Sequence, residues 1–475
     1  MFELSQHIDK NKIFMVNLSE IEGRLDPYYF HPKFKFIENK IPKKKQIQIK
    51  QIKTKIFSGI TPKSGGKAYT TKEVGIPFIR SGDFSEENII NFDQINYIKP
   101  EIHNGIMKSS KIQKNDILIA IVGATIGKVS IYKYDREANI NQAICAIRLN
   151  KKLYIPNFVQ IFLLTNIGQL IIDRLKRPVA RANINLEEIA SIILPKINIK
   201  KQQEIIDYYT LQIFKKQQKE AKADQLLNSI DDYLLGKLGI LLPEKNNSLE
   251  SRIFKVNFSE VTGGRWDAFY YQRYFKENIN NIKNGYYQTC TLKSILKDNL
   301  IKGKLPNNNE KNGENKVIQI GSIDNYGNID LENLLSAKDI FIEEQKLKMN
   351  DVIVVITGAT IGKIAFWNYN GTYYLGGDLV KFQIKEQVNP YYIFSLLQTK
   401  PYQIEIERNV TGATNGHLAP NDIEYFPIPL PPLEKQNEIA EHIKKIREQA
   451  KQLKQEAKEV LKEAKQKVEK MILGE

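Results

Sequence analysis

The sequence predicts an α+β protein with two globular mixed α/β domains, related by an internal repeat and separated by two long antiparallel coiled-coil helices. Three observations predict this fold. A 19-residue segment of the first half returns in the second half, short apolar runs bracket a glycine-containing turn in each copy, and two long stretches carry a heptad pattern of apolar residues. With 475 residues the chain is long enough for about two to four domains.

The repeat has three landmarks in the same order in both halves. Each copy opens alike, with FMVNLSEIEGRLDPYY at 14–29 and FKVNFSEVTGGRWDAFYY at 254–271. In the middle, KNDILIAIVGATIGKVSIY at 114–132 returns as MNDVIVVITGATIGKIAFW at 349–367, and each copy closes with LPKINIKKQQEI at 194–205 or IPLPPLEKQNEI at 428–439. Between the landmarks the copies differ, so the two domains are expected to share a frame and to differ in their loops.

The central landmark predicts a strand, a tight turn and a return strand. The strands are expected at 117–122 and 129–132 in the first copy and at 352–356 and 364–367 in the second. The GATIGK turn lacks the glycine spacing and the following helix of a phosphate-cradling Walker loop, which argues against nucleotide binding there. Its glycines are expected to take positive φ, with Lys128 and Lys363 able to reach a phosphate. A purely structural hairpin with solvated lysines is the alternative.

Each copy ends in a predicted helix. Residues 433–473 contain no Pro or Gly and repeat apolar side chains with heptad spacing, and the first copy has a weaker seam, interrupted by Lys216 and Glu220. The residues predicted to form the coiled coil or bind a partner are Ile206, Tyr209, Ile213, Leu227, Ile230, Leu234, Ile439, Ile443, Ile446, Leu453, Val460 and Val468. A single seam needs a partner, and each helix is expected to find it in the other.

These landmarks predict the domain boundaries. The expected order is a first domain at 1–195, a central helix at 196–240, a linker at 241–250, a second domain at 251–430 and a C-terminal helix at 431–475.

The charge distribution favours a polyanionic partner. The formal net charge is +16. Residues 1–199 hold 31 basic and 18 acidic side chains, a net +13, whereas residues 241–432 hold 21 of each. A basic surface concentrated in the first domain is typical of nucleic-acid binding.

Catalysis and metal binding find no support in the sequence. The five His and two Cys residues have no metal-ligand spacing, and no Ser/His/Asp arrangement can be argued from their order. No apolar stretch is long enough to cross a membrane, and the N-terminus lacks a secretory signal, so a cytoplasmic protein without membrane contact is expected.

The duplicated order of the three landmarks resembles the DNA-specificity (S) subunit of type I restriction-modification systems. In that family each copy contains a target-recognition domain that reads one half of a bipartite double-stranded DNA site, and the two long helices pack antiparallel as spacer and docking surface. The resemblance implies a non-catalytic subunit that directs two methyltransferase subunits, and in some systems translocase-nuclease subunits, to the site. It implies no cofactor on this chain, because the methyl donor belongs to the partner.

This resemblance directs attention to side chains in loops that could reach DNA. The candidates are Lys63, Ser64, Lys67, Arg80, Lys128, Arg177, Arg181 and Asn183 in the first copy, and Lys302, Lys304, Gln319, Lys363, Thr411, Asn415 and His417 in the second. Arg24 with Asp26, and Arg265 with Asp267, are instead expected to form a buried ion pair that fixes each domain. Two alternatives for the whole chain are a non-DNA-binding scaffold that assembles a methyltransferase complex and an independent enzyme.

Overall fold

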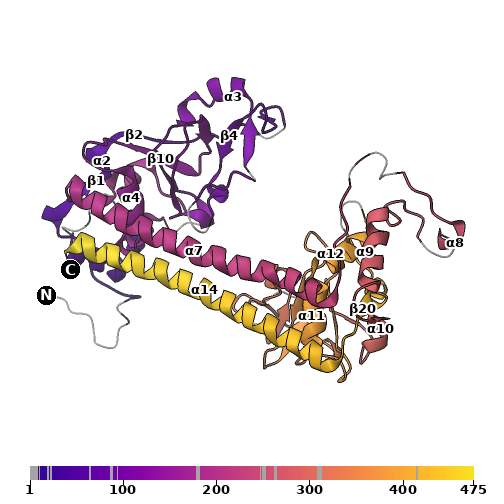
Figure 1. Cartoon of the computed structure of the whole chain (residues 1–475). Helices are drawn as coiled ribbons and strands as arrows, with labels where there is room; N and C mark the ends of the chain where they lie inside the picture. Colours follow the sequence, from indigo (N-terminus) through magenta and orange to yellow (C-terminus); the bar gives the residue numbers. More distant parts are fainter. Residues whose placement is uncertain are drawn as a thin grey trace. The chain divides into compact units, whose positions relative to one another are not determined.

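The computed structural model describes residues 9, 11–18, 21, 24–63, 66–85, 89–93, 95–177, 182–246, 248, 253–261, 265–306, 313–412 and 416–474. The chain forms two compact units (Figure 1). Unit 1 comprises Met1–Gln218 with Glu456–Glu475, and unit 2 comprises Lys219–Gln455. The division therefore passes through both long helices, and each unit contains part of each helix. The predicted five-part partition of the chain stays a prediction.

Unit 1 has a mixed α/β fold. Its strands are β1 (Gln46–Gln48), β2 (Lys53–Ser58), β3 (Tyr69–Thr70), β4 (Ile76–Ile79), β5 (Asn96–Ile98), β6 (Lys111–Ile112), β7 (Ile117–Ala120), β8 (Val129–Ile131), β9 (Ala138–Ile140), β10 (Ile144–Leu149) and β11 (Ile193–Pro195). Its helices, besides the long ones, are α1 (Lys35–Lys40), α2 (Ile49–Ile52), α3 (Pro100–Asn104), α4 (Pro156–Leu163), α5 (Asn166–Leu175) and α6 (Leu186–Ser191). A four-stranded sheet in the order β2-β10-β7-β8 lies next to a five-stranded sheet in the order β3-β5-β4-β9-β6.

Unit 2 repeats this architecture. Its strands are β12 (Thr289–Thr291), β13 (Ile301–Lys302), β14 (Asn315–Ile318), β15 (Leu335–Ala337), β16 (Val352–Val355), β17 (Ile364–Phe366), β18 (Tyr373–Leu375), β19 (Leu379–Phe382) and β20 (Pro427–Pro429). Its helices, besides the long ones, are α8 (Phe258–Val261), α9 (Arg273–Lys283), α10 (Leu292–Ile295), α11 (Pro390–Gln398), α12 (Lys400–Asn409) and α13 (Pro420–Glu424). The sheet order β13-β19-β16-β17 matches that of unit 1. The internal repeat found in the sequence is therefore a repeat of topology.

The central strand of each sheet is buried on both faces. In β7 and the residue after it, Ile117, Ile119 and Ile121 belong to one core cluster, and Leu118 and Ala120 belong to another. The strand β16 divides in the same way between two clusters of unit 2. Because side chains alternate between the faces of a strand, such a strand reads as a continuous apolar run, which is why the repeat was visible in the sequence.

The two long helices are α7 (Ile199–Leu238) and α14 (Leu433–Leu473). In unit 1 the start of α7 packs on the end of α14, where Ile205 and Tyr209 share a core cluster with Ala464 and Val468. In unit 2 the end of α7 packs near the start of α14 in the same core cluster, and Lys237 lies 3.7 Å from Glu438. Each unit by itself thus shows the predicted antiparallel pairing (Figure 1).

Most of the predicted seam residues lie inside these cores. Ile206, Tyr209, Ile230, Leu234, Ile439, Ile443, Ile446 and Val468 are buried, and Ile213, Leu227, Leu453 and Val460 are partly buried. Apart from Leu453 and Val460, these side chains belong to, or pack against, the core clusters that the long helices share with the globular part of each unit. The large apolar residues that α7 leaves exposed are different ones. They are Ile199 at its first position and, further along, Leu211 and Phe214, about half of whose surface is accessible.

Both long helices begin with the same buried glutamine. Gln202 accepts from the backbone N–H of Ile155 at 2.8 Å, and Gln436 accepts from that of Asn389 at 2.9 Å. Each also donates to a backbone carbonyl just before its own helix, Ile197 or Pro431. The Ile-Asn pair at 197–198, which stands where the second copy has Pro431-Pro432, therefore leaves this attachment of the helix intact.

No single described helix is long and apolar enough to cross a membrane; the helix pair α4 and α5 meets the length and composition criteria only as a span bent by 78°.

Candidate nucleic-acid interface

Three loops meet in each unit around the GATIGK turn, and we call them together the three-loop surface. In unit 1 they are residues 80–84, 122–128 and 182–184, and in unit 2 they are residues 319–323, 357–363 and 416–418. The backbone N–H of Gly123 donates to the carbonyl of Ala182 at 2.9 Å, and that of Gly358 donates to the carbonyl of Gly416 at 3.2 Å. Isolated β-bridges between Val122 and Asn183 and between Thr357 and His417 add to these contacts.

The lysine of each turn ties the first loop to the second. Lys128 Nζ donates to the Phe84 carbonyl at 3.1 Å, and Lys363 Nζ donates to the Ile323 carbonyl at 3.0 Å. Both ammonium groups are partly buried. Both lysines thus hold the first two loops together. These hydrogen bonds also fix the position of the ammonium group that could contact a phosphate.

Two glycines in each three-loop surface face open space. A Cβ atom added at Gly82, Gly123, Gly321 or Gly358 would meet no other atom within 4 Å. Gly123 and Gly358 also have positive φ, +73° and +84°, as the sequence predicted for this turn. Backbone that is not shielded by a side chain allows a ligand's own backbone to approach closely.

The first loop begins with a different side chain in each unit but keeps the same backbone. Arg80 is followed by a short 3-10 turn, and its backbone N–H and guanidinium donate to Asp83 at 2.7 and 3.1 Å. At the matching place in unit 2, the backbone N–H of Gln319 donates to Ser322 Oγ at 3.3 Å. Arg80 remains partly exposed beside its ion-pair partner.

The third loop also differs between the units. Arg177 donates from two guanidinium nitrogens to Glu188 at 3.1 and 3.0 Å, and Asn183 lies on the bridge to the GATIGK turn. In unit 2, Thr411 and His417 exchange backbone hydrogen bonds at 2.9 and 2.8 Å and close this loop at its base. Burial raises the pKa of Asp422 in α13, against the opposing effect of Arg265 and His417.

Three predicted DNA contacts, Ser64, Arg181 and Asn415, lie outside the described residues. Four other candidates are lysines on or shortly after β2 or β13, the edge strands of the four-stranded sheets. Lys63 and Lys67 are exposed between β2 and β3, and Lys302 is exposed on β13. Lys304 donates to the Ile340 carbonyl at 2.8 Å and packs over the Phe341 ring.

A further element of the repeat lies in this region and escaped the sequence comparison. Gly59 donates to the Ile144 carbonyl and Gly303 to the matching Leu379 carbonyl, and an added Cβ at either glycine would clash with backbone. The shared signal is a Gly directly after the last paired residue of β2 or β13 and a Pro three residues further, SGITP at 58–62 and KGKLP at 302–306. It was too short to be recognised without the sheet.

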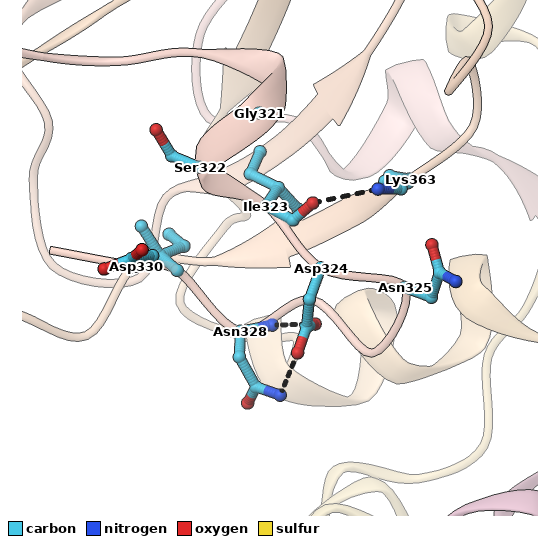
Figure 2. A pocket seen from close by; sticks show the side chains of 9 residues that line it. Gly321, Ser322, Ile323, Asp324, Asn325, Asn328, Asp330 and Lys363 are labelled. Atoms are coloured by element: carbon cyan, nitrogen blue, oxygen red, sulfur yellow. Dashed lines mark hydrogen bonds between the residues drawn. The ribbon is translucent and has the colours of Figure 1, made fainter. Parts of the chain in front are cut away.

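A hollow of about 570 Å³ lies beside Lys363 in unit 2 (Figure 2). Asp324 and Asp330 line it, but their carboxylates accept hydrogen bonds from the loop itself, from Asn328 and Asn333 respectively. The hydrogen bond from Asn333 holds the pKa of Asp330 below its usual range. The exposed amide of Asn325 therefore offers a donor and acceptor fork suited to base edges, whereas the Nδ2 atom of exposed Asn328 already donates to Asp324 and its amide oxygen can accept.

Asn325 and Asn328 were absent from the sequence-based candidates. They lie in the stretch 323–348, which has little resemblance to its counterpart 84–113. That divergence was itself the available signal, because two readers of different half-sites must differ where they contact bases.

The arginine and aspartate near the start of each unit form the predicted ion pairs, but the pairs are not fully buried, and the Asp267 side chain is 43% exposed. Arg24 lies 2.7 Å from Asp26, and Arg265 lies 2.8 Å from Asp267. Each arginine also packs on one face of a tyrosine whose ring is within reach of a second arginine. The distances from guanidinium carbon to ring centroid are 4.9 Å for Arg24 and 4.3 Å for Arg174 on Tyr29, and 4.9 Å for Arg265 and 3.9 Å for Arg408 on Tyr270. These stacks attach the first landmark of each copy to α5 or α12.

Within the part of the chain that the structure describes, no group of three or more His, Cys, Asp or Glu side chains is placed to hold a metal ion.

Comparisons with known proteins place these features in a family context. Residues 284–463 match the family model of the type I restriction modification DNA specificity domain. The type I restriction enzyme EcoBI specificity subunit of Escherichia coli is 30% identical over 194 residues, which is 41% of this chain and 37% of that protein. The putative type I restriction enzyme MjaX specificity subunit of Methanocaldococcus jannaschii is 24% identical over 88% of this chain and 91% of its own length. These matches confirm the resemblance that the three landmarks indicated.

Solved structures that are similar to this chain share little sequence with it. A chain from a structural study of complex assembly and conformational transition in a type I R-M system has a TM-score of 0.46 and 13% identity, over 90% of this chain and 96% of that one. The S subunit of a type I restriction-modification system from M. genitalium has a TM-score of 0.40 and 12% identity, over 90% and 95%.

Proposed function

We propose, on the premise that this chain resembles the specificity subunits of type I restriction-modification systems, that it reads a bipartite double-stranded DNA site. Each unit would recognise one half-site, and the chain would direct two methyltransferase subunits, and restriction subunits where the system has them, to that site. The chain itself would carry no catalytic residue and no cofactor, with the methyl donor on the partner. The chain would act in the cytoplasm, where double-stranded DNA that carries this site is present.

The observation that carries this proposal is the duplicated three-loop surface. The two units keep the same backbone hydrogen bonds around the GATIGK turn, but Arg80 is replaced by Gln319, and the loops that follow diverge. A shared frame with different side chains is what two readers of different sequences require, because phosphates are alike in both half-sites and base edges are not.

The open glycines and the side chains around them have separate proposed roles. Gly82, Gly123, Gly321 and Gly358 let the DNA backbone approach the surface. Exposed Lys63, Lys67 and Lys302 neutralise phosphates, whereas Arg80, Gln319, Asn325 and Asn328 are placed for base edges. Arg177, Asn183, Thr411 and His417 shape the third loop of the surface, and Ser64, Arg181 and Asn415 remain proposed contacts from sequence alone.

The test places a carboxylate on the proposed DNA-facing surface. Gly82→Glu and Gly321→Glu each fill open space, so the fold should be kept, and each should weaken binding of the methyltransferase complex to its DNA site at least tenfold by repelling phosphates. Gly236→Glu on α7 is the matched control, since a Cβ there also meets no atom within 4 Å. The complexes are compared on labelled DNA that contains the site, identified by mapping methylated adenines in the host genome.

The outcome separates the alternatives. Loss of binding in both three-loop variants and not in the control supports DNA recognition by both units. If the wild-type complex fails to shift DNA, the scaffold alternative gains, and if all three variants behave alike, the three-loop surface is not the interface.

A further inference from the structure

Each unit has a basic pocket at the same place in the repeat. The first basic pocket, of about 300 Å³, lies in unit 1 among β8, α4, α7 and α14. The second basic pocket, of about 710 Å³, lies in unit 2 among β17, α11 and α14. The lining residues correspond pairwise: Ile131 and Phe366 on the return strands, Tyr134 and Tyr369 after them, and Ile213 and Arg447 on the long helices.

Both pockets have an excess of positive charge. Lys133, Lys216 and Lys465 line the first, and none of its described lining residues is acidic. Lys444, Lys445, Arg447 and Lys451 line the second, together with one carboxylate, Glu448, while Lys444 is paired with Glu441 at 2.7 Å. The side chains differ between the pockets, but the sign of the charge is the same. In each unit, basic side chains therefore line a pocket beside the long helices, and few acidic side chains line the same pocket.

The cations are held among apolar and aromatic side chains. Lys216 interrupts the heptad seam of α7 and is 6% exposed, next to Tyr209 and Ile213. Burial lowers the pKa of Lys465 on α14. Removing the Lys465 ammonium group from water has a cost, which a bound anion would offset.

The second pocket repeats this combination around Arg447. Its guanidinium donates to the carbonyl of Tyr326 at 2.5 Å and to Gln398, and it lies 4.9 Å from the Phe394 ring centroid. Its Nε atom is buried without a hydrogen-bond partner among the described residues. Burial lowers the pKa of Arg447 as well, against the effect of Tyr391 and Asp324.

We propose that the two basic pockets each receive a segment of a protein partner that carries acidic side chains beside aliphatic or aromatic ones. This inference rests on the proposed function, in which the partner is the methyltransferase subunit present twice. Charge complementarity selects an acidic segment, and the apolar walls select side chains that can be buried with it. DNA fits less well, because a phosphate has no apolar group to cover Ile131, Ile213 or Phe394 and is bound at open, wet surfaces.

Charge reversal inside and outside the pockets tests the proposal on the full chain. Lys465→Glu in the first pocket and Lys451→Glu in the second should each lower the affinity for the purified cognate methyltransferase subunit at least tenfold. Lys462→Glu and Lys458→Glu make the same change on exposed positions of the same helix and should have little effect. Equal losses in pocket and control variants would overturn the proposal.

A cross-linking experiment avoids dependence on charge reversal. A photoreactive benzoylphenylalanine in place of Gln217 or Asn368, both exposed at a pocket, should attach to a methyltransferase peptide that contains Asp or Glu beside apolar residues. Attachment to DNA, to a basic peptide or to the chain's own Glu86–Glu87 segment would overturn it. If the wild-type chain does not bind the methyltransferase at all, the proposed function fails; if it binds and the pocket variants match their controls, only this inference fails.

Discussion

A buried ion pair occurs at the same place in both units, with the same acidic residue but a different basic residue. Asp116 in unit 1 lies 2.7 Å from Arg148, and Asp351 in unit 2 lies 2.8 Å from Lys381. Each aspartate is fully buried and also accepts from a backbone N–H three residues earlier, at Gln113 or Lys348. The carboxylate therefore ends the turn before the central strand, and the cation on the neighbouring strand neutralises it.

Removing the cation should be costly. Lys381→Met leaves Asp351 charged and buried, so we expect the free energy of unfolding of unit 2 to fall by about 3–5 kcal/mol. The double variant Asp351→Asn with Lys381→Met should recover much of that loss. Urea denaturation followed by the fluorescence of buried Trp367, in a Trp266→Phe background, measures it. A single variant as stable as the wild type would show that water reaches this pair.

A buried carboxyl in α12 predicts a pH dependence. Burial raises the pKa of Glu405 above its ordinary value of 4.5, although Arg408 and Asn409 oppose this effect. A carboxyl with a raised pKa binds its proton more readily in the folded state, so the free energy of unfolding should fall as the pH rises from 4.5 through the folded-state pKa.

Glu405→Gln should remove that part of the pH dependence. The free energy of unfolding of the variant should fall less than that of the wild type between about pH 4.5 and neutral pH, in the same fluorescence assay. Glu407→Gln is the control, because Glu407 lies in the same helix, two residues after Glu405, and is exposed. Parallel pH profiles for the wild type and Glu405→Gln would contradict the assignment.

The long helices have two roles at the scale of elements. Ala464 and Val468 of α14 belong to the core of unit 1, and Ile439 and Ile443 belong to that of unit 2. Deleting residues 433–475 would therefore expose the cores of both units and could not separate partner binding from folding. Surface substitutions are the appropriate test of docking.

The exposed face of α7 offers such a test. Leu211 and Phe214 are 51% and 54% exposed, and apolar side chains outside the seam are candidates for contact with the methyltransferase subunit. Leu211→Gln with Phe214→Gln should lower the affinity for that subunit at least tenfold without changing the unfolding transition. Thr210→Gln with Lys215→Gln, also exposed, is the matched control. Unchanged affinity in the first variant would exclude this face as a docking surface.

At the scale of the molecule, both helices pass from one unit to the other. Adding one heptad to each helix, after Gln218 in α7 and after Gln455 in α14, lengthens both connections by about 10 Å in register. Base pairs stack at about 3.4 Å, so this corresponds to roughly three base pairs. The methylated motif of the double-insertion variant should keep its half-site sequences while the unread gap grows. Changed half-sites with an unchanged gap would show that the helices do not set the spacing.

The sequence by itself determined the duplication, the central strands, the turn glycines and the long helices. These features depend on local patterns, since a strand buried on both faces needs an apolar run and a positive φ favours glycine. The tertiary structure decided what those patterns could not. Lys128 and Lys363 bind carbonyls distant in sequence, Asn325 and Asn328 line a hollow that only the folded loop creates, and Ile213 and Arg447 line matching basic pockets. Such contacts depend on which loops the sheets bring together. The periodicity of apolar residues along the chain does not show which residues distant in sequence will be neighbours in the fold.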